Sequence, residues 1–211
     1  MENYKKNLEL LTKNHVYSKE MEHDACGVGL IASTEGKKSR AIVEYGIEAL
    51  KAVWHRGAVD ADGKTGDGAG IHVEIPKDFF IEKIQVTGHD YDNSEICVGM
   101  IFLPRNDYSA QESCKTIVES ELTKNNFSIY GWRQVPVNSK VLGEKALQTM
   151  PEIIQVLFKP NDPNLLDKNL ERKIYEIRKR IENKAFDASL NNFYICSISS
   201  KSIIYKGLYL A

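Results

Sequence analysis

The sequence has 211 residues, of which 42% are hydrophobic and 27% are charged, a composition that excludes a disordered or collagen-like chain. Its 28 basic and 29 acidic residues leave a net charge of −1. No overall positive field therefore draws the chain to nucleic acid or to an anionic membrane.

The cysteines argue against metal binding and against secretion. The four cysteines lie at positions 26, 97, 114 and 196 and include no Cys-x-x-Cys pair, the local signature of a structural zinc or iron–sulfur site. The five histidines lack His-Glu-x-x-His spacing, so we predict no metal site. A chain of this length with so few cysteines has no disulfide framework, and we expect it to work in the reducing cytoplasm. No apolar run reaches the roughly 18 residues that a membrane span requires.

The first 25 residues differ from the rest of the chain. They mix acidic residues with lysines and lack the continuous apolar segment of a secretory signal. Apolar patterning begins only at Cys26. We therefore predict a leader over residues 1–25 and a folded domain over residues 26–211.

Apolar periodicity after the leader predicts strands and helices in mixed order. In chain order we expect a strand over 26–32, a helix over 40–55, a shaped loop over 56–70, a strand over 71–75, a short helix over 78–84, a strand over 96–103, a helix over 109–124, an extended segment over 127–137, a short helix over 142–150, a strand over 153–159, a helix over 165–188 and strands over 193–199 and 202–210. Only Ser200 and Lys201 separate the last two strands, so these are expected to form a hairpin. Long apolar strands and amphipathic helices in this order indicate an α+β layered domain. Because the last strand runs on to Ala211 without a polar tail, we expect the fold to continue beyond that residue.

The segment over residues 56–70 carries five glycines in 15 residues, which is typical of a shaped loop. It lacks the Gly-x-x-x-x-Gly-Lys-Ser/Thr pattern of a phosphate-binding loop. A calcium loop starting at Asp60 would place Lys64 and Ile71 at ligand positions, so that interpretation fails. The glycines at 27 and 29 do not indicate a dinucleotide site, because a strand and not a helix is expected after them.

Cys26 begins the first apolar segment, and it allows two interpretations. One is a small buried hydrophobic residue at the start of a strand. The other is a nucleophile, which needs an activating base. Cleavage between Ala25 and Cys26 would supply that base, because the freed α-amino group has a pKa of about 7.7–8.0, close to the working pH of a general base. The small residue before Cys26 and the otherwise unexplained leader are consistent with such a cut.

Five segments of the chain carry a resemblance to a known family. They are DACGVG (24–29), HRGAVDADGKTGDGAGI (55–71), YGWRQVPV (130–137), MPEIIQ (150–155) and YKG (205–207). In this order they resemble the N-terminal glutamine amidotransferase type-2 (class II) domain of the glutamate synthase large subunits, which are N-terminal nucleophile (Ntn) hydrolases. The resemblance covers essentially the whole chain, and the leader is typical of glutamate synthases within the wider superfamily.

The resemblance implies a four-layer αββα sandwich and removal of the leader as a propeptide. It implies that the Cys26 thiolate attacks the side-chain amide of L-glutamine, with the α-amino group of Cys26 as base, to give a γ-glutamyl thioester and ammonia. Water would then release glutamate. In the full-length enzymes the ammonia passes through a tunnel to a flavin domain, where it aminates 2-oxoglutarate with FMN and an iron–sulfur cluster. A small electron-transfer subunit is a further partner that the resemblance suggests.

Two features of the family are missing from the sequence. It contains no Asn-Gly pair for the oxyanion hole, and no segment like His-Ser-Arg-Phe-Ser-Thr-Asn to hold the substrate carboxylate. In the family both lie C-terminal to the end of this sequence, so we expect the fold to be incomplete at its C-terminus and this stretch to be inactive alone. Only Cys26 is carried over as a catalytic residue. Arg56 and Asp67 are expected beside it, or else as a helix cap and a loop-shaping residue.

A rival hypothesis is a non-catalytic binding module of the same fold, or the remnant of a decaying gene, that associates with another chain through its terminal strand. The resemblance places the substrate-binding residues, and the region that distinguishes NADPH from ferredoxin as electron donor, beyond Ala211.

Overall fold

The computed structural model describes residues 6–7, 9–10, 13, 27–53, 58–208 and 210. Most of the predicted leader therefore lies outside the described residues, and so do Cys26 and Arg56. None of the helices in the described part of the chain is long and apolar enough to cross a membrane.

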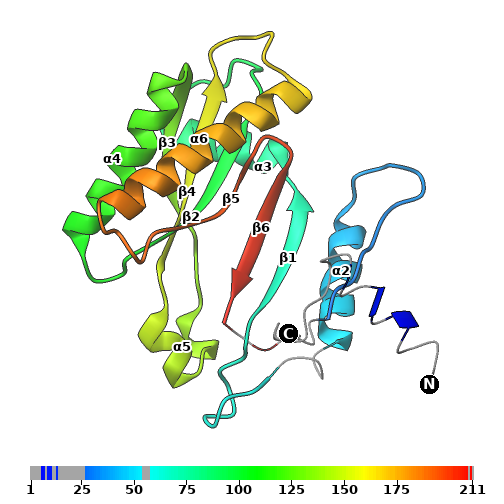
Figure 1. Ribbon diagram of the computed structural model, residues 1–211. Helices are drawn as coiled ribbons and strands as arrows, with labels where there is room; N and C mark the ends of the chain where they lie inside the picture. Colours follow the sequence, from blue (N-terminus) through cyan, green and yellow to red (C-terminus); the bar gives the residue numbers. More distant parts are fainter. Residues whose placement is uncertain are drawn as a thin grey trace.

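Most of the predicted helices and strands are present, with small shifts at their ends (Figure 1). The elements are α2 (Arg40–Ala52), β1 (Ala69–Glu74), α3 (Lys77–Val86), β2 (Cys97–Leu103), α4 (Tyr108–Lys124), β3 (Phe127–Gln134), the 3-10 turn η2 (Ser139–Val141), α5 (Glu144–Thr149), β4 (Glu152–Pro160), α6 (Asp167–Asp187), β5 (Tyr194–Ser199) and β6 (Ser202–Gly207). The sequence did not predict η2, which begins after the side chain of Asn138 accepts a hydrogen bond from the Lys140 N–H.

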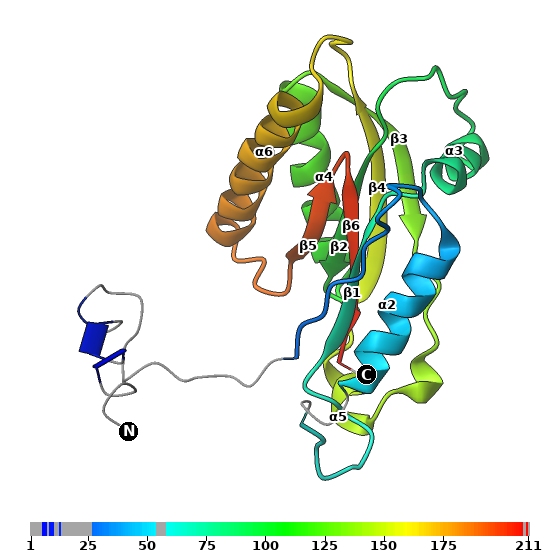
Figure 2. The same ribbon diagram turned by 90° about the vertical axis from the view of Figure 1, so that its right-hand side faces the viewer.

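The strands form two antiparallel sheets, one of four strands in the order β3-β4-β2-β5 and one of the two strands β1 and β6. Helices α4 and α6 pack on one face of the larger sheet. On its other side the larger sheet contacts β6, and β1 in turn contacts α2 (Figure 2). The succession of helix, sheet, sheet and helix is the α+β, αββα arrangement predicted for the chain.

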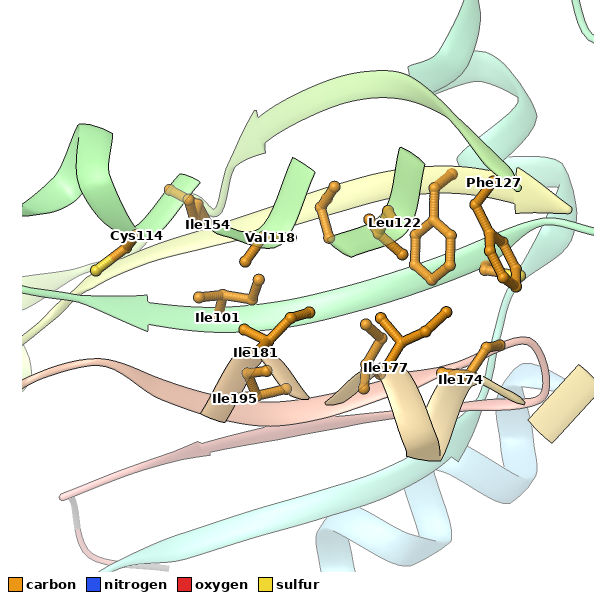
Figure 3. Close-up of a cluster of buried hydrophobic side chains, with 14 of the residues drawn as sticks. Ile101, Cys114, Val118, Leu122, Phe127, Ile154, Ile174, Ile177, Ile181 and Ile195 are labelled. Carbon is orange, nitrogen blue, oxygen red and sulfur yellow. The ribbon is translucent and has the colours of Figure 1, made fainter. Parts of the chain in front are cut away.

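The larger of the two cores lies between the larger sheet and its two helices (Figure 3). Helix α6 presents an apolar stripe at helical spacing, and all of its members are buried. They are Leu170, Ile174, Ile177, Ile181 and Ala185. The second core joins the opposite face of the larger sheet to α3 and β6, and it includes Phe80, Met100, Leu157 and Ile203.

The predicted strand over 26–32 is wrong for the residues that are described, since 27–32 pair with no other strand. Val28 is 91% exposed and Leu30 is 89% exposed. An apolar run forms a strand only where another strand offers its backbone groups, and no described strand does so here.

The predicted hairpin is also wrong, because β6 pairs with β1 and not with β5. The chain turns between the sheets at 199–202, where the Ser199 hydroxyl oxygen accepts the Lys201 and Ser202 N–H groups. The Glu171 carboxylate of α6 accepts hydrogen bonds from the Ser199 hydroxyl at 2.9 Å and from the Ser200 N–H at 2.7 Å. The short spacing of the last strands therefore predicted a turn correctly, but not the strand that pairs with β6.

Candidate functional site

A pocket of about 1610 Å³ opens between the end of the β1–β6 sheet, α5 and the inner face of the larger sheet. Its walls come from segments that lie far apart in the sequence. They include residues 67–72, 102–107, 135–139, 148–151, 191–194 and 204–208. Leu50 and Val53 at the end of α2 and Gly27 also line it.

The segments that carry the family resemblance converge on this pocket. Residues 67–71, 135–137 and 205–207 all line it, as do Met150 and Pro151. Gly27 also belongs to the first of those segments and lines the same pocket. The resemblance thus maps to one surface of the folded chain, which identifies this pocket as the candidate site.

Of the three predicted site residues, only Asp67 lies within the described part of the chain. Cys26 and Arg56 lie outside the described residues. Asp67 is exposed and lines the pocket, and its backbone N–H donates to the Ala58 carbonyl at 3.2 Å. Its carboxylate makes no hydrogen bond or ion pair with any other residue that the structure describes.

The glycine-rich loop owes its shape to Asp62, which the sequence analysis did not single out. The Asp62 carboxylate accepts the backbone N–H groups of Lys64 at 2.9 Å and Thr65 at 2.7 Å, and the Thr65 hydroxyl at 2.6 Å. These hydrogen bonds, with the Thr65 hydroxyl first, hold the pKa of Asp62 well below its ordinary value. An aspartate followed by a glycine in a turn is the signal that predicts such a side-chain-to-backbone arrangement.

The same loop is joined to α5, some eighty residues further along the chain. The Thr65 hydroxyl oxygen accepts the Ala146 N–H of α5 at 3.5 Å, and the backbone N–H of Glu144 at the start of α5 also lowers the pKa of Asp62. On the outer side Lys145 forms an ion pair with Asp60 at 2.7 Å. We call the contacts of Asp62 and Thr65 with the start of α5 the loop–α5 junction.

Residues 26–211 of the chain match the family of class-II glutamine amidotransferases. The chain belongs to this family. The match confirms the resemblance predicted from the five sequence segments.

The relatives that this amidotransferase chain resembles are glutamate synthases. It is 53% identical over 208 residues to the glutamate synthase [NADPH] large chain of Azospirillum brasilense, an alignment that covers 99% of this chain and 14% of the relative. It is 39% identical over 190 residues to the chloroplastic ferredoxin-dependent glutamate synthase of Spinacia oleracea, which covers 89% of this chain and 12% of the relative. The chain therefore spans only about one seventh to one eighth of the length of these relatives.

A buried polar chain joins the two sheets of the amidotransferase beside the pocket. The fully buried Gln155 of β4 accepts a hydrogen bond from the Arg133 guanidinium at 2.8 Å, and its amide nitrogen lies 3.5 Å from the Tyr205 hydroxyl. All three residues belong to the segments that carry the resemblance. Because a buried amide must find hydrogen-bond partners, Gln155 fixes β6 against the larger sheet.

The thiols that are described in this amidotransferase do not fit an iron–sulfur cluster. Cys97, Cys114 and Cys196 are free and buried, and the described residues contain no group of three or more side chains able to hold a metal ion. Burial raises the pKa of the Cys114 thiol to about 11 and also raises the pKa values of Cys97 and Cys196. Because cluster ligands are thiolates, none of the three is suited to that role.

Proposed function

We propose that the chain forms the N-terminal part of the glutaminase unit of a glutamate synthase. The carrying observation is that the class-II amidotransferase family matches from residue 26 onward, so that the match starts on a cysteine. The glutamate synthase relatives support the choice of enzyme within the family. The matched range also supports our division of the chain into a leader over 1–25 and an amidotransferase domain from Cys26.

We further propose that cleavage after Ala25 makes Cys26 the first residue and the nucleophile. Gly27, which a single peptide bond joins to Cys26, lines the pocket and supports this role. With a pKa of about 7.7–8.0, the freed α-amino group accepts the thiol proton near neutral pH.

The proposed reaction passes through a thioester. The Cys26 thiolate attacks the side-chain carbonyl carbon of L-glutamine, and a carbon–sulfur bond replaces the carbon–nitrogen bond. The departing nitrogen takes the proton that the α-amino group removed from the thiol and leaves as ammonia. Water then attacks the γ-glutamyl thioester, which releases glutamate and regenerates the thiol.

Asp67 and Arg56 are proposed neighbours of the nucleophile. The position of Asp67 on the pocket wall supports this, because the pocket is large enough for an amino acid. In the assay described below, Asp67→Asn and Arg56→Lys should lower kcat/KM for glutamine and leave folding intact. Unchanged kinetics would remove them from the site.

The remaining parts of the enzyme are proposed to lie outside this stretch. FMN and an iron–sulfur cluster, with a small electron-transfer subunit as partner, would serve the amination of 2-oxoglutarate by the released ammonia. We place the enzyme in the cytoplasm, because free thiols at Cys97, Cys114 and Cys196 are typical of a reducing compartment.

The full-length protein tests this function through Cys26→Ser. We expect N-terminal sequencing of the wild type to begin at Cys26, and the variant to lose glutamine hydrolysis by a factor on the order of 1000 or more. Glutamate and ammonia release is measured directly, and ammonia-driven conversion of 2-oxoglutarate shows that the variant is folded. Cys114→Ala is the matched control, because that thiol lies in the helical core.

Glutamine hydrolysis by Cys26→Ser at the wild-type rate would overturn the assignment. A wild-type protein without glutaminase activity, still carrying its leader, would instead favour the non-catalytic binding module.

A further inference from the structure

We propose that Asp62, Thr65 and Gly143 are positioning residues of the glutamine site, which hold one wall of the pocket in place through the loop–α5 junction. This inference rests on the proposed function. None of the three lines the pocket, so they act through the residues that do.

The two halves of the junction each carry part of the pocket wall. Two residues after Thr65, the loop supplies Asp67 and Gly68 to the lining. Three residues after Gly143, α5 supplies Ala146, and the end of the helix supplies Thr149. Residues 62–65 of the loop meet residues 143–146 at this junction, so the junction sets the width of the pocket at this point.

The junction leaves no room for a side chain at residue 143. A Cβ atom on Gly143 would lie 2.2 Å from the Thr65 hydroxyl oxygen, 2.3 Å from an Asp62 carboxylate oxygen and 2.5 Å from the Thr65 backbone nitrogen. The last of these is a backbone atom and cannot rotate away. Thr65 is itself only 8% exposed, so a larger residue at 143 must push the loop and α5 apart.

The chemistry of the junction also favours one fixed arrangement. The Asp62 carboxylate accepts two N–H groups and the Thr65 hydroxyl from the loop, and the Thr65 hydroxyl oxygen in turn accepts the Ala146 N–H of α5 at 3.5 Å. A carboxylate with so many donors holds its partners in fixed directions. The Asp60–Lys145 pair on the outer side is different, because Lys145 is 64% exposed and an exposed ion pair contributes little.

The decisive experiment compares Thr65→Val with Thr65→Ser in the full-length enzyme. Valine keeps the shape of threonine but has no hydroxyl, whereas serine keeps the hydroxyl that contacts Asp62 and Ala146. We expect Thr65→Val to raise the KM for glutamine about tenfold, the size of one lost hydrogen bond to a charged group, while kcat changes much less. Thr65→Ser should restore the wild-type KM to within about twofold.

Glycine variants give a second, independent comparison. Gly143→Ala introduces the clash described above and should raise the KM for glutamine at least as much as Thr65→Val. Gly46→Ala is the matched control. Gly46 lies in α2, and a Cβ on it would make an ordinary contact at 3.4 Å with the side chain of Ile71 in β1. Its KM should equal that of the wild type.

Ammonia-driven conversion of 2-oxoglutarate separates positioning from folding, since ammonia bypasses the glutamine site. It should be unchanged in all four variants. Equal KM values for Thr65→Val and Thr65→Ser would overturn the inference, and so would a parallel loss of the glutamine-driven and ammonia-driven rates. A wild-type enzyme without glutaminase activity would overturn the proposed function and this inference with it, whereas equal KM values in an active enzyme would overturn the inference alone.

Discussion

Two helices of this chain carry similar apolar stripes and reach different degrees of burial. Helix α6 packs on β5 and α4, and its stripe belongs to a core with residues from all four strands of the larger sheet. Its members Ile174 and Ile177 are at most 1% exposed. Helix α2 presents Ile42, Ile47 and Leu50 in a comparable stripe, yet it contains no buried residue. Among the described elements it packs on β1 of the small sheet. Amphipathic patterning therefore predicts which face a helix turns inward, but the surface available to receive that face decides how much it buries.

The helical core and the pocket lie on opposite sides of the larger sheet. The core under α4 and α6 is closed and well packed. The pocket lies on the other side, where the loop, α5 and the end of α2 form its walls. Because local opening is easiest where few apolar groups are buried, we expect the pocket side to open more readily than the helical core.

The largest stability effect is expected for Ile177→Ala in α6. Its side chain is fully buried, so truncation leaves a cavity in the core and should lower the free energy of opening of α6 and β2 by about 3 kcal/mol. Native-state hydrogen exchange of the full-length protein measures this for the two elements directly. A loss below about 1 kcal/mol would show that the two sides of the molecule do not differ as described.

A smaller effect is expected for Ile47→Ala in α2, which shortens a half-buried side chain. Hydrogen exchange should show a loss of about 1 kcal/mol, confined to α2 and β1. A loss as large as that of Ile177→Ala would mean that α2 is covered in the full-length protein by a surface absent from the described residues.

The smallest effect is expected for Asp92→Asn, which loosens the loop before β2. Hydrogen bonds from Lys159 first, and then from Ser94 and Tyr130, hold the pKa of Asp92 well below its ordinary value of about 3.9. A lowered pKa stabilises the fold above about pH 4, and this contribution is lost as the pH falls through the folded-state pKa. Since the carboxylate side chain is 47% exposed, the change at neutral pH should stay below about 1 kcal/mol.

The pH dependence gives the sharper readout for Asp92. Between pH 5 and pH 8 the difference between wild type and Asp92→Asn should be constant, and below pH 4 it should shrink. Exchange of β3 and β4 amides, corrected for the intrinsic rate, follows this difference. A difference that grows on acidification would contradict the direction of the pKa shift.

The helices and inner strands could be predicted because their signals are local. Helix α6 repeats apolar residues every three or four positions, and β2 is an unbroken apolar run of strand length. The partner of β6 and the absence of pairing at 27–32 could not be predicted in this way. Strand pairing depends on which strand edge, often distant in the sequence, is available, and a local sequence pattern does not show which edge that is.

In the candidate site, too, residues in local motifs could be predicted, whereas contacts between distant segments could not. Asp67 was proposed from the family motif and lines the pocket, while its role beside the nucleophile stays a prediction. The contact of Asp62 with α5 and the chain of Arg133, Gln155 and Tyr205 were not predicted, because each joins segments at least twenty residues apart. Cys26 and Arg56 remain predictions from the family motif alone.

The Glu171 carboxylate has a mechanical consequence for the whole domain. It accepts hydrogen bonds from Ser199 and Ser200 in the turn through which the chain passes from one sheet to the other. Strand β6 runs from that turn to the pocket wall at Lys206 and Gly207. A close-packed interior transmits a displacement instead of absorbing it. A shift of α6 along its axis therefore displaces β6 and, with it, a pocket wall to which no residue of α6 contributes.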